Sequence, residues 1–296
     1  GSRVVSQLGY VVTSRVLTGA TERGKVLGES VSGLAAYQNA FLIVMLPHGL
    51  ITVSLVTALY TSLSEAASRD DTRQVRRYHD QGLRLPAVII VPGCVFLAVL
   101  APYITSTFFF SNSLDQTRAI AVVLSVIAWM AIPMSWTYLN DRVFYAHEMT
   151  WMSFRLQCVT TGVATIGAVV ALQVDPARTA MVLGAGQVLA FVVSAAVGFW
   201  VLRRMIGNLG LRSTARTYVL LLLPAIVTAV GLLLAIGRLF PDLGETRGAS
   251  GLLAGGLVLG AAGAIQLGVT WGVASLLGVR EISTALQPVT RRLRRR

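Results

Sequence analysis

The sequence predicts an all-α polytopic membrane protein with about eight transmembrane helices. The chain of 296 residues is 54% hydrophobic and 13% charged, against about 25% charged in an ordinary soluble domain, and its mean hydropathy is +0.69. Its apolar residues form long runs that reach the roughly 20 residues needed to cross a bilayer. Twenty-three of its 25 cations, of which only Lys25 is lysine, lie in or beside the polar gaps between those runs.

The cations mostly occupy alternate gaps, which indicates the orientation of the chain. Seventeen lie in four gaps: 61–84, 141–155, 202–216 and 279–296. Six lie in the gaps between them: 21–30, 103–118, 173–178 and 238–249. Because cytoplasmic loops carry the excess of Lys and Arg, the first set is expected in the cytoplasm. An even number of spans then places both ends of this piece on the cytoplasmic side.

Eight apolar runs predict the spans, and the first of them is the most polar. They are 3–20, 31–62, 84–110, 118–146, 151–173, 178–205, 215–240 and 250–279. Because the first run includes Gln7 and Arg15, we expect a helix that lines a polar interior. The alternative is an interfacial or signal-like segment, although the run lacks a clean apolar region and a cleavage site.

The second run, 31–62, is too long for one straight crossing. As a helix it would extend about 48 Å, against a hydrocarbon core of about 30 Å. Pro47 near its middle predicts a kink, and a neighbouring helix or polar side chain must then compensate the lost backbone hydrogen bond. Pro92, Pro133 and Pro224 predict kinks in later spans.

The polar stretch 64–84 predicts a short surface helix, because Glu65 with Arg69 and Asp70 with Arg73 have the spacing of helical ion pairs. Adjacent aspartates at 70 and 71 also occur in metal-diphosphate motifs. No second acidic motif accompanies them in the sequence, so a solvated cytoplasmic loop is the favoured interpretation.

Few side chains are suited to catalysis or metal binding. Cys94 and Cys158 lie inside apolar runs and are expected to be buried thiols, and the three histidines are scattered. Asp141 and Glu148, near the end of the fourth span, are expected at the cytoplasmic interface. We therefore predict no enzyme, no metal site and no cofactor, and a coupling ion, if one is used, stays unknown. Cations confined to membrane edges also argue against binding of nucleic acid.

The polar residues inside or beside the spans have two interpretations each. Gln38 and Asn39 can contact a substrate or form hydrogen bonds between helices. Arg142 and Arg155, like Arg203 and Arg204, can serve a site or extend toward the membrane surface. Arg15 lies within the first span and is the only charged candidate for a substrate contact, because an ionisable group at membrane depth is a functional candidate by default.

Specific residues carry a family resemblance. Pro47-His48-Gly49-Leu50, followed by Ser62 to Ala67, resembles the second C-lobe helix of the MurJ/MviN lipid II flippases. Ser6-Gln7 is similar to the start of that lobe's first helix. Arg142-Val143-Phe144-Tyr145-Ala146, with Thr150 four residues on, resembles the family's Arg-x-Phe-Tyr-Ala segment. The chain looks most like an actinobacterial-type branch.

The resemblance implies a MOP-superfamily (MATE-like) exporter fold of fourteen helices. Residues 1–205 would be the C-lobe, family helices 7–12, and residues 206–279 a two-helix C-terminal tail, helices 13–14. Residues 280–296 would be a basic cytoplasmic juxtamembrane segment. The implied function is movement of undecaprenyl-diphosphate-linked peptidoglycan precursor (lipid II) from the inner to the outer leaflet of the bacterial plasma (inner) membrane by alternating access.

The resemblance also implies partners and a site. The partners are the lipid-linked sugar substrate, an N-terminal lobe absent from this chain, and a cytoplasmic kinase-like domain or cell-wall regulators. Candidate contacts to the substrate are Gln7, Arg15, Gln38 and Asn39. The sequence departs from the family where Ala40-Phe41-Leu42 stands in place of Ala-Asp-Arg, so that a cavity arginine is lost, and where Trp151 replaces a proline.

Alternatives remain open at this point. The chain could belong to another exporter of the superfamily, for drugs or a different polyprenyl-linked glycan, or to a scaffold that recruits cell-wall enzymes without transport. The basic stretch 291–296 could anchor the topology, attract anionic lipids at about 1 kcal/mol per cation, or do both.

Overall fold

The structure is a computed structural model that describes residues 2–27, 33–244, 248–279 and 281. Every regular element within these ranges is a helix, which confirms the predicted all-α class. Seven helical stretches in the described part are long and apolar enough to cross a membrane. The first helix is not among them, in keeping with its polar residues.

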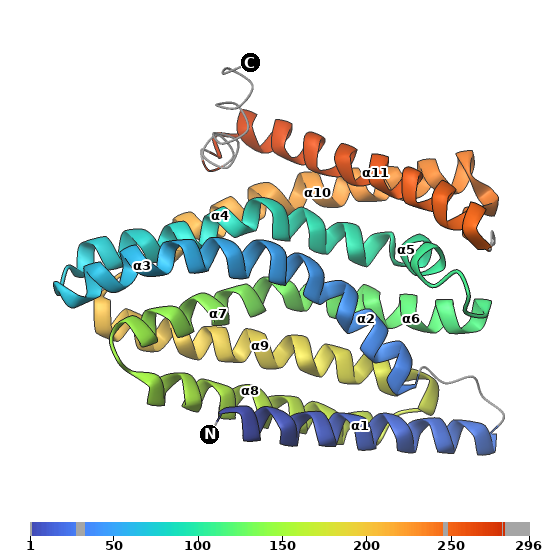
Figure 1. Ribbon diagram of the computed structural model, residues 1–296, viewed down its shortest axis with the longest axis horizontal. Helices are drawn as coiled ribbons and strands as arrows, with labels where there is room; N and C mark the ends of the chain where they lie inside the picture. Colours follow the sequence, from blue (N-terminus) through green and yellow to red (C-terminus); the bar gives the residue numbers. More distant parts are fainter. Residues whose placement is uncertain (1, 28–32, 245–247, 280, 282–296) are drawn as a thin grey trace.

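The helices follow the predicted spans in order (Figure 1). The first four spans are formed by α1 (Ser2–Leu27), α2 (Leu34–Pro47), η1 (His48–Val53), α3 (Ser54–Ser68), α4 (Thr72–Val99), α5 (Ala101–Phe108), α6 (Leu114–Ile127), η2 (Ala128–Met130) and α7 (Ala131–Ala146). The remaining elements are α8 (Thr150–Ala171), α9 (Pro176–Ile206), α10 (Leu211–Leu239), η3 (Pro241–Gly244) and α11 (Gly248–Leu276).

Two of the predicted kinks coincide with changes of helix type. Pro47 ends α2 and is followed by six residues of π-helix in η1 before α3 begins. A 3₁₀ turn, η2, lies just before Pro133. Helices α4 and α10, in contrast, continue through Pro92 and Pro224. Local π and 3₁₀ turns are the usual way in which a membrane helix accommodates an interruption of its hydrogen-bond ladder.

The predicted surface helix between the second and third spans is not formed as a separate element. Helix α3 extends to Ser68 and α4 begins at Thr72, so the spanning helices themselves fill this stretch. Arg69 does pair with Glu65 at 2.7 Å. Asp71 is the N-cap of α4, and its side chain accepts from the backbone N–H of Gln74 at 3.0 Å. The aspartate pair thus belongs to a helix start, because a carboxylate satisfies an otherwise free N–H there.

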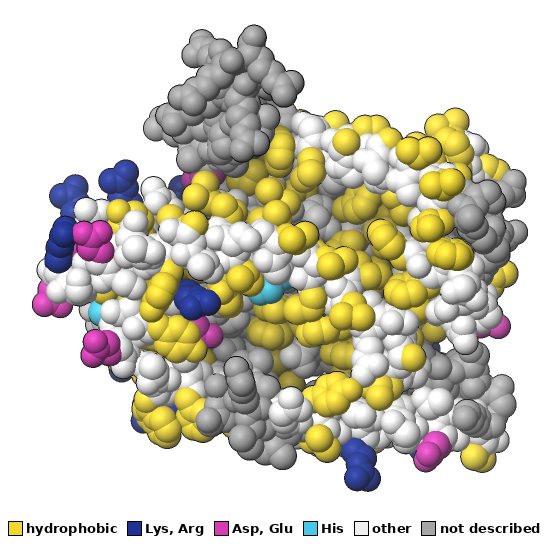
Figure 2. Space-filling view, viewed as in Figure 1, with side chains coloured by type: hydrophobic (Ala, Val, Ile, Leu, Met, Phe, Trp, Pro, Cys, Tyr) yellow, Lys and Arg dark blue, Asp and Glu magenta, His cyan; other side chains and the backbone are white. Residues whose placement is uncertain are grey.

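The arginine-rich turns gather at one end of the bundle. The α3–α4, α7–α8 and α9–α10 turns all lie at the left of Figure 1, whereas α5 leads into α6, and α8 into α9, at the right. Figure 2 shows Lys and Arg side chains clustered at that left end, with mainly apolar side chains across the middle of the face. The alternation in the sequence is therefore a real polarity of the molecule.

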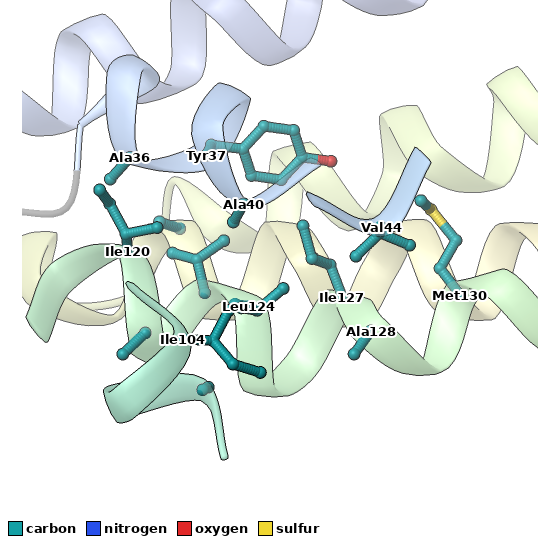
Figure 3. Close-up of a cluster of buried hydrophobic side chains, with 14 of the residues drawn as sticks. Ala36, Tyr37, Ala40, Val44, Ile104, Ile120, Leu124, Ile127, Ala128 and Met130 are labelled. Atoms are coloured by element: carbon teal, nitrogen blue, oxygen red, sulfur yellow. The ribbon is translucent and has the colours of Figure 1, made fainter. Parts of the chain in front are cut away.

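The largest core cluster joins α2 to α6 (Figure 3). The inward residues of α2 are mostly small, with Ala36, Ala40 and Val44 buried. They face Ile120, Leu124 and Ile127 of α6 among other residues of the cluster. Lipid is as apolar as these side chains, so close packing rather than exclusion of water holds such helices together. Small residues allow that close approach.

The two final helices pack mainly against α4 and against each other. One hydrogen bond from α11 compensates for a missing backbone hydrogen bond in α4. Pro92 has no N–H, so the carbonyl of Val88 four residues earlier loses its helical donor. The indole Nε1–H of Trp271 in α11 donates to that carbonyl at 2.8 Å. The hydrogen bond lost at a proline in one helix is thus replaced by a side chain from another.

Replacing Trp271 with phenylalanine is expected to loosen this docking. Phenylalanine keeps an aromatic ring but leaves the Val88 carbonyl without a donor, which should cost about 1–3 kcal/mol of the free energy of unfolding. Thermal unfolding of the purified protein in detergent would measure the loss. Trp200→Phe is the matched control, because Trp200 is 55% exposed. Equal melting temperatures for the two variants would contradict the expectation.

The predicted juxtamembrane segment 280–296 lies outside the described residues, apart from Glu281. The division at residue 205 stays a prediction. In the structure, the chain passes from the predicted C-lobe to the two-helix tail in the turn between α9 and α10. Gly207 and Gly210 in this turn adopt positive φ angles of 84° and 65°. Glycine takes up such angles at little cost, so it suits a tight reversal of the chain.

Candidate functional site

A cavity of about 590 Å³ lies between α1, α2, α8 and α9. Helix α1 packs along α8 and contacts α2 only slightly, so α1 and α2 leave a space between them. The cavity is lined by Gly9, Tyr10, Thr13, Leu34, Tyr37, Gln38, Phe41, Leu42, Gln157, Thr160, Thr161, Ala164, Gln187 and Phe191.

The polar part of this lining consists of amides and hydroxyls and, among these residues, includes no charged side chain. Gln38 of α2 donates from Nε2 to the hydroxyl of Tyr10 on α1, at 2.7 Å. Gln157 donates from Nε2 to Oγ1 of Thr161 within α8, at 3.3 Å. Such groups can form hydrogen bonds with sugar hydroxyls and amides. They cannot by themselves neutralise a diphosphate.

The apolar part of the lining includes the position of the lost arginine. Phe41 and Leu42, which stand where the family resemblance places Asp and Arg, both line the cavity. Leu42 is 62% exposed. The substitution noted in the sequence therefore changes the wall of the cavity itself, from charged to apolar.

Of the four candidate contact residues, the structure places Gln38 on the cavity wall. Gln38 also forms a hydrogen bond between helices, and its contact with a substrate stays a prediction. Gln7 and Arg15 are exposed residues of α1 outside the lining, and Asn39 is half-buried on α2 beside Gln38 but also outside it. For these three a role in binding stays a prediction.

The motif residues have structural roles. Pro47 precedes the π-helix, and Phe144 is fully buried. Arg142 donates from Nη2 to the hydroxyl of Tyr138, and its guanidinium carbon lies 5.4 Å from the ring centroid of Tyr60. Arg142 therefore joins α7 to α3 at the arginine-rich end. Two further members of the motif, Tyr145 and Thr150, are exposed.

One expectation about a single residue was wrong. Cys94 is buried as expected, but Cys158 is exposed on α8, because an apolar run does not reveal which face of its helix points outward. Asp141 is half-buried near the end of α7, and its Oδ1 atom is buried without a hydrogen-bond partner among the described residues; its position at the membrane interface stays a prediction. Within the described part, no group of His, Cys, Asp and Glu could hold a metal ion.

Sequence reasoning missed most of the far wall. Gln187 and Thr161 line the cavity, yet neither stood out in the sequence. The available signal was a polar amide within an otherwise apolar run, as at Gln187 in α9. Such a residue at membrane depth is costly unless it faces a cavity or a partner.

Comparison with known proteins agrees with this architecture. Residues 5–244 match the family model described as lipid II flippase MurJ. A solved structure of the lipid II flippase MurJ in an inward closed conformation is similar in fold, with a TM-score of 0.58 at 18% sequence identity. The match covers 90% of this chain and 51% of the flippase, so the chain spans about half the length of that protein.

The family match includes α1 to α10, and with them every helix that lines the cavity. The family consists of transporters, not enzymes, which agrees with the scarcity of catalytic side chains. The chain is a multi-pass membrane protein, and it belongs to the MurJ family of lipid II flippases.

Proposed function

We propose that this chain is the C-terminal half of a lipid II flippase, which moves undecaprenyl-diphosphate-linked peptidoglycan precursor from the inner to the outer leaflet by alternating access. The observation that carries the proposal is the cavity between α1, α2, α8 and α9, in a chain of the MurJ family. A space lined by amides, hydroxyls and aromatic rings suits a sugar-peptide headgroup that must leave water.

A second lobe would supply the opposite wall of the pathway. Transporter sites commonly lie between two halves of the molecule, and this chain spans 51% of the solved flippase. The cavity lining described here has no charge of its own. We infer that cations for the diphosphate come from that second lobe, together with Arg15.

The arginine-rich end is proposed to be cytoplasmic, in the inner membrane of a bacterium. Arg155 and Arg204 lie over the rings of Trp151 and Trp200, at 5.5 Å and 3.9 Å from the ring centroids. Tryptophan and arginine together are typical of a membrane–water interface. By this assignment the segment 280–296 would meet anionic lipids and lead toward any kinase-like domain or regulator. No cofactor is proposed.

Filling the cavity should abolish transport. Ala164→Trp places an indole in the space between α8 and α2, whereas Ile166→Trp on the same helix points outward, because Ile166 is 65% exposed. In cells depleted of their own flippase, full-length protein with Ala164→Trp should fail to restore growth although its membrane abundance is normal. Ile166→Trp should restore growth fully.

The identity of the lipid that accumulates tests the substrate. Lipid II retained on the cytoplasmic face of cells with Ala164→Trp would support the proposal. Accumulation of a different polyprenyl-linked glycan would favour another exporter of the superfamily. Normal growth with the cavity filled would contradict transport through this cavity and favour a scaffold. Arg15→Ala in the same assay tests the charged candidate, since full rescue would remove Arg15 from the site.

A further inference from the structure

A second cavity of about 150 Å³ adjoins the first, since Gln157, Thr160 and Phe191 line both. It lies among η1, α7, α8 and α9, and its lining includes His48 and Asp141. Its volume is enough for several water molecules. It therefore connects the buried side chain of His48 and the half-buried side chain of Asp141 with the larger cavity.

Both of these side chains have a buried polar atom without a partner among the described residues. These atoms are Oδ1 of Asp141 and Nδ1 of His48. Burying a polar group without a hydrogen bond costs several kcal/mol, and an ionised carboxylate costs far more. Two such atoms on the wall of one cavity suit it to an occupant that can form hydrogen bonds with them or carry positive charge.

The neighbouring groups do not neutralise Asp141. Arg142 exerts its charge on Asp141, but its hydrogen bond goes to Tyr138, and no ion pair with Asp141 occurs in the described part. The hydroxyls of Thr160 and Ser194 in the cavity both donate to the carbonyl of Leu156. Their protons are therefore not available to the carboxylate.

The titratable and charged groups around Asp141 are few. Besides His48 of η1, the cavity lining includes Tyr138 of α7, while α8 and α9 contribute only neutral side chains. The hydroxyl of Ser153 in α8 also acts on the Asp141 carboxyl, as a hydrogen-bonding neighbour. His79 of α4 bonds to Asn140 at 3.1 Å and is not part of the lining.

The chemistry of the two free atoms favours a proton over a metal ion. A carboxylate oxygen and an imidazole nitrogen are both proton acceptors, and imidazole is a poor ligand for hard alkali cations. Chains of Asp, Glu and His are the usual proton relays of membrane transporters. His48 is also the first residue of the π-helix, and π-helical turns frequently occur at functional sites.

We propose that Asp141 and His48 form a proton-binding site whose occupancy is coupled to movement of the bent second span. The ring of His48 meets that of Tyr138 edge to face, with centroids 5.9 Å apart. The site therefore joins the π-helical bend between α2 and α3 to α7. A change of charge there alters the contact that holds the bend. This inference rests on the proposed transport function and assigns to it a coupling ion.

Infrared difference spectroscopy of the purified full-length protein, between about pH 5 and about pH 8, tests the site without requiring transport. The wild type should show a protonated-carboxyl band that exchanges slowly in heavy water, and Asp141→Asn should lose that band. Asp115→Asn is the control, since Asp115 is exposed at the start of α6. If the Asp141 variant does not accumulate in membranes, the wild-type spectrum alone tests the proposal. A wild type without the protonated-carboxyl band overturns it.

A transport assay is the second test of the proton-binding site. Lipid II flipping in proteoliposomes should depend on internal pH in the wild type and lose that dependence in Asp141→Asn and in His48→Gln. A His48→Gln protein with the pH profile of the wild type would overturn the pairing. A spectral change produced by Na⁺ at constant pH would overturn the assignment of the bound ion as a proton and favour an alkali cation instead. If the band titrates but no lipid II is flipped, the site stands and the proposed function fails.

Discussion

Replacing Gly186 with leucine should cause a large loss of stability. A Cβ atom on Gly186 would lie 2.9 Å from the Cα of Gly167, and one on Gly167 would lie 2.8 Å from the Cα of Gly186. Helices α8 and α9 therefore touch backbone to backbone at this point. A backbone cannot move aside as a flexible side chain can, so the two helices would have to separate.

The expected cost is about 3 kcal/mol or more, at the upper end of the range for overpacking. The effect should extend to the cavity, because α8 and α9 carry Gln157 and Gln187 on its wall. The measurement is thermal unfolding of the purified protein in detergent, together with its yield from membranes.

Gly162 provides the matched control. It lies on α8, like Gly167, but a Cβ atom there would meet nothing within 4 Å. Gly162→Leu should unfold close to the wild-type temperature. A Gly186→Leu protein as stable as the Gly162→Leu protein would show that the close contact between the helices does not hold in the molecule.

The sequence predicted the large features of the fold because they depend on composition along the chain. Apolar runs of the right length indicated the spans, and Pro47 indicated the irregular second span. The sorting of arginines into alternate gaps indicated the two ends of the bundle. Each of these signals is local, so no knowledge of the packing was needed to read it.

The site was only partly predictable, because it depends on which faces of different helices meet. Gln38 was identified, since an amide beside an apolar run is conspicuous. Gln187 was not identified, although it too is an amide in an apolar run, because the sequence of α9 does not show which face of that helix meets α1 and α2. Asp141 was assigned to the interface from its position near the end of a span, whereas packing of η1, α8 and α9 around it determines its burial.

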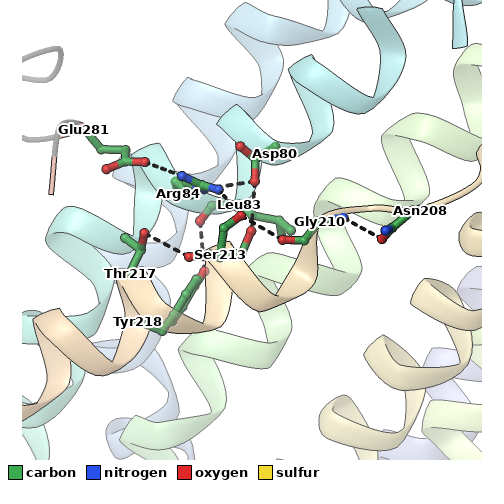
Figure 4. A network of polar contacts seen from close by, with 10 residues as sticks. Asp80, Leu83, Arg84, Asn208, Gly210, Ser213, Thr217, Tyr218 and Glu281 are labelled. Atoms are coloured by element: carbon green, nitrogen blue, oxygen red, sulfur yellow. Dashed lines mark hydrogen bonds and ion pairs between the residues drawn. The ribbon is translucent and has the colours of Figure 1, made fainter. Parts of the chain in front are cut away.

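Arg84 is another residue whose role lies in packing. In the sequence it is one of five cations in the gap 61–84, and so one of many that indicate topology. In the structure its guanidinium is the centre of a polar network at the docking site of the tail (Figure 4). It donates to Asp80 at 2.9 Å, to Glu281 at 2.8 Å and to the hydroxyl of Ser213.

This network joins three parts of the chain. Asp80 and Arg84 belong to α4 and Ser213 to α10, while Glu281 follows α11. Asp80 also accepts from the hydroxyl of Thr214, at 2.8 Å. The side chain of Arg84 is only 19% exposed. Its planar fork of donors reaches several partners at once, which lysine cannot reproduce.

Arg84→Met should therefore weaken the attachment of α10 and α11 to α4. Methionine keeps much of the apolar stem but leaves Asp80 and Glu281 without their cation, at an expected cost of about 2 kcal/mol for polar groups that are partly exposed. Arg84→Lys should recover only part of this. The attachment of α10 and α11 to α4 is measured by the rate of limited proteolysis between α9 and α10, together with thermal unfolding.

Arg73→Met is the matched control. Arg73 is an exposed residue of the same helix, α4, and its replacement removes the same charge. A general effect of net charge on membrane topology would appear in both variants. Loss of docking would appear only when Arg84 is replaced. Equal cleavage and equal melting temperatures in the two variants would mean that Arg84 contributes to topology alone, and that the apolar contacts of α4 with α10 suffice to hold the tail.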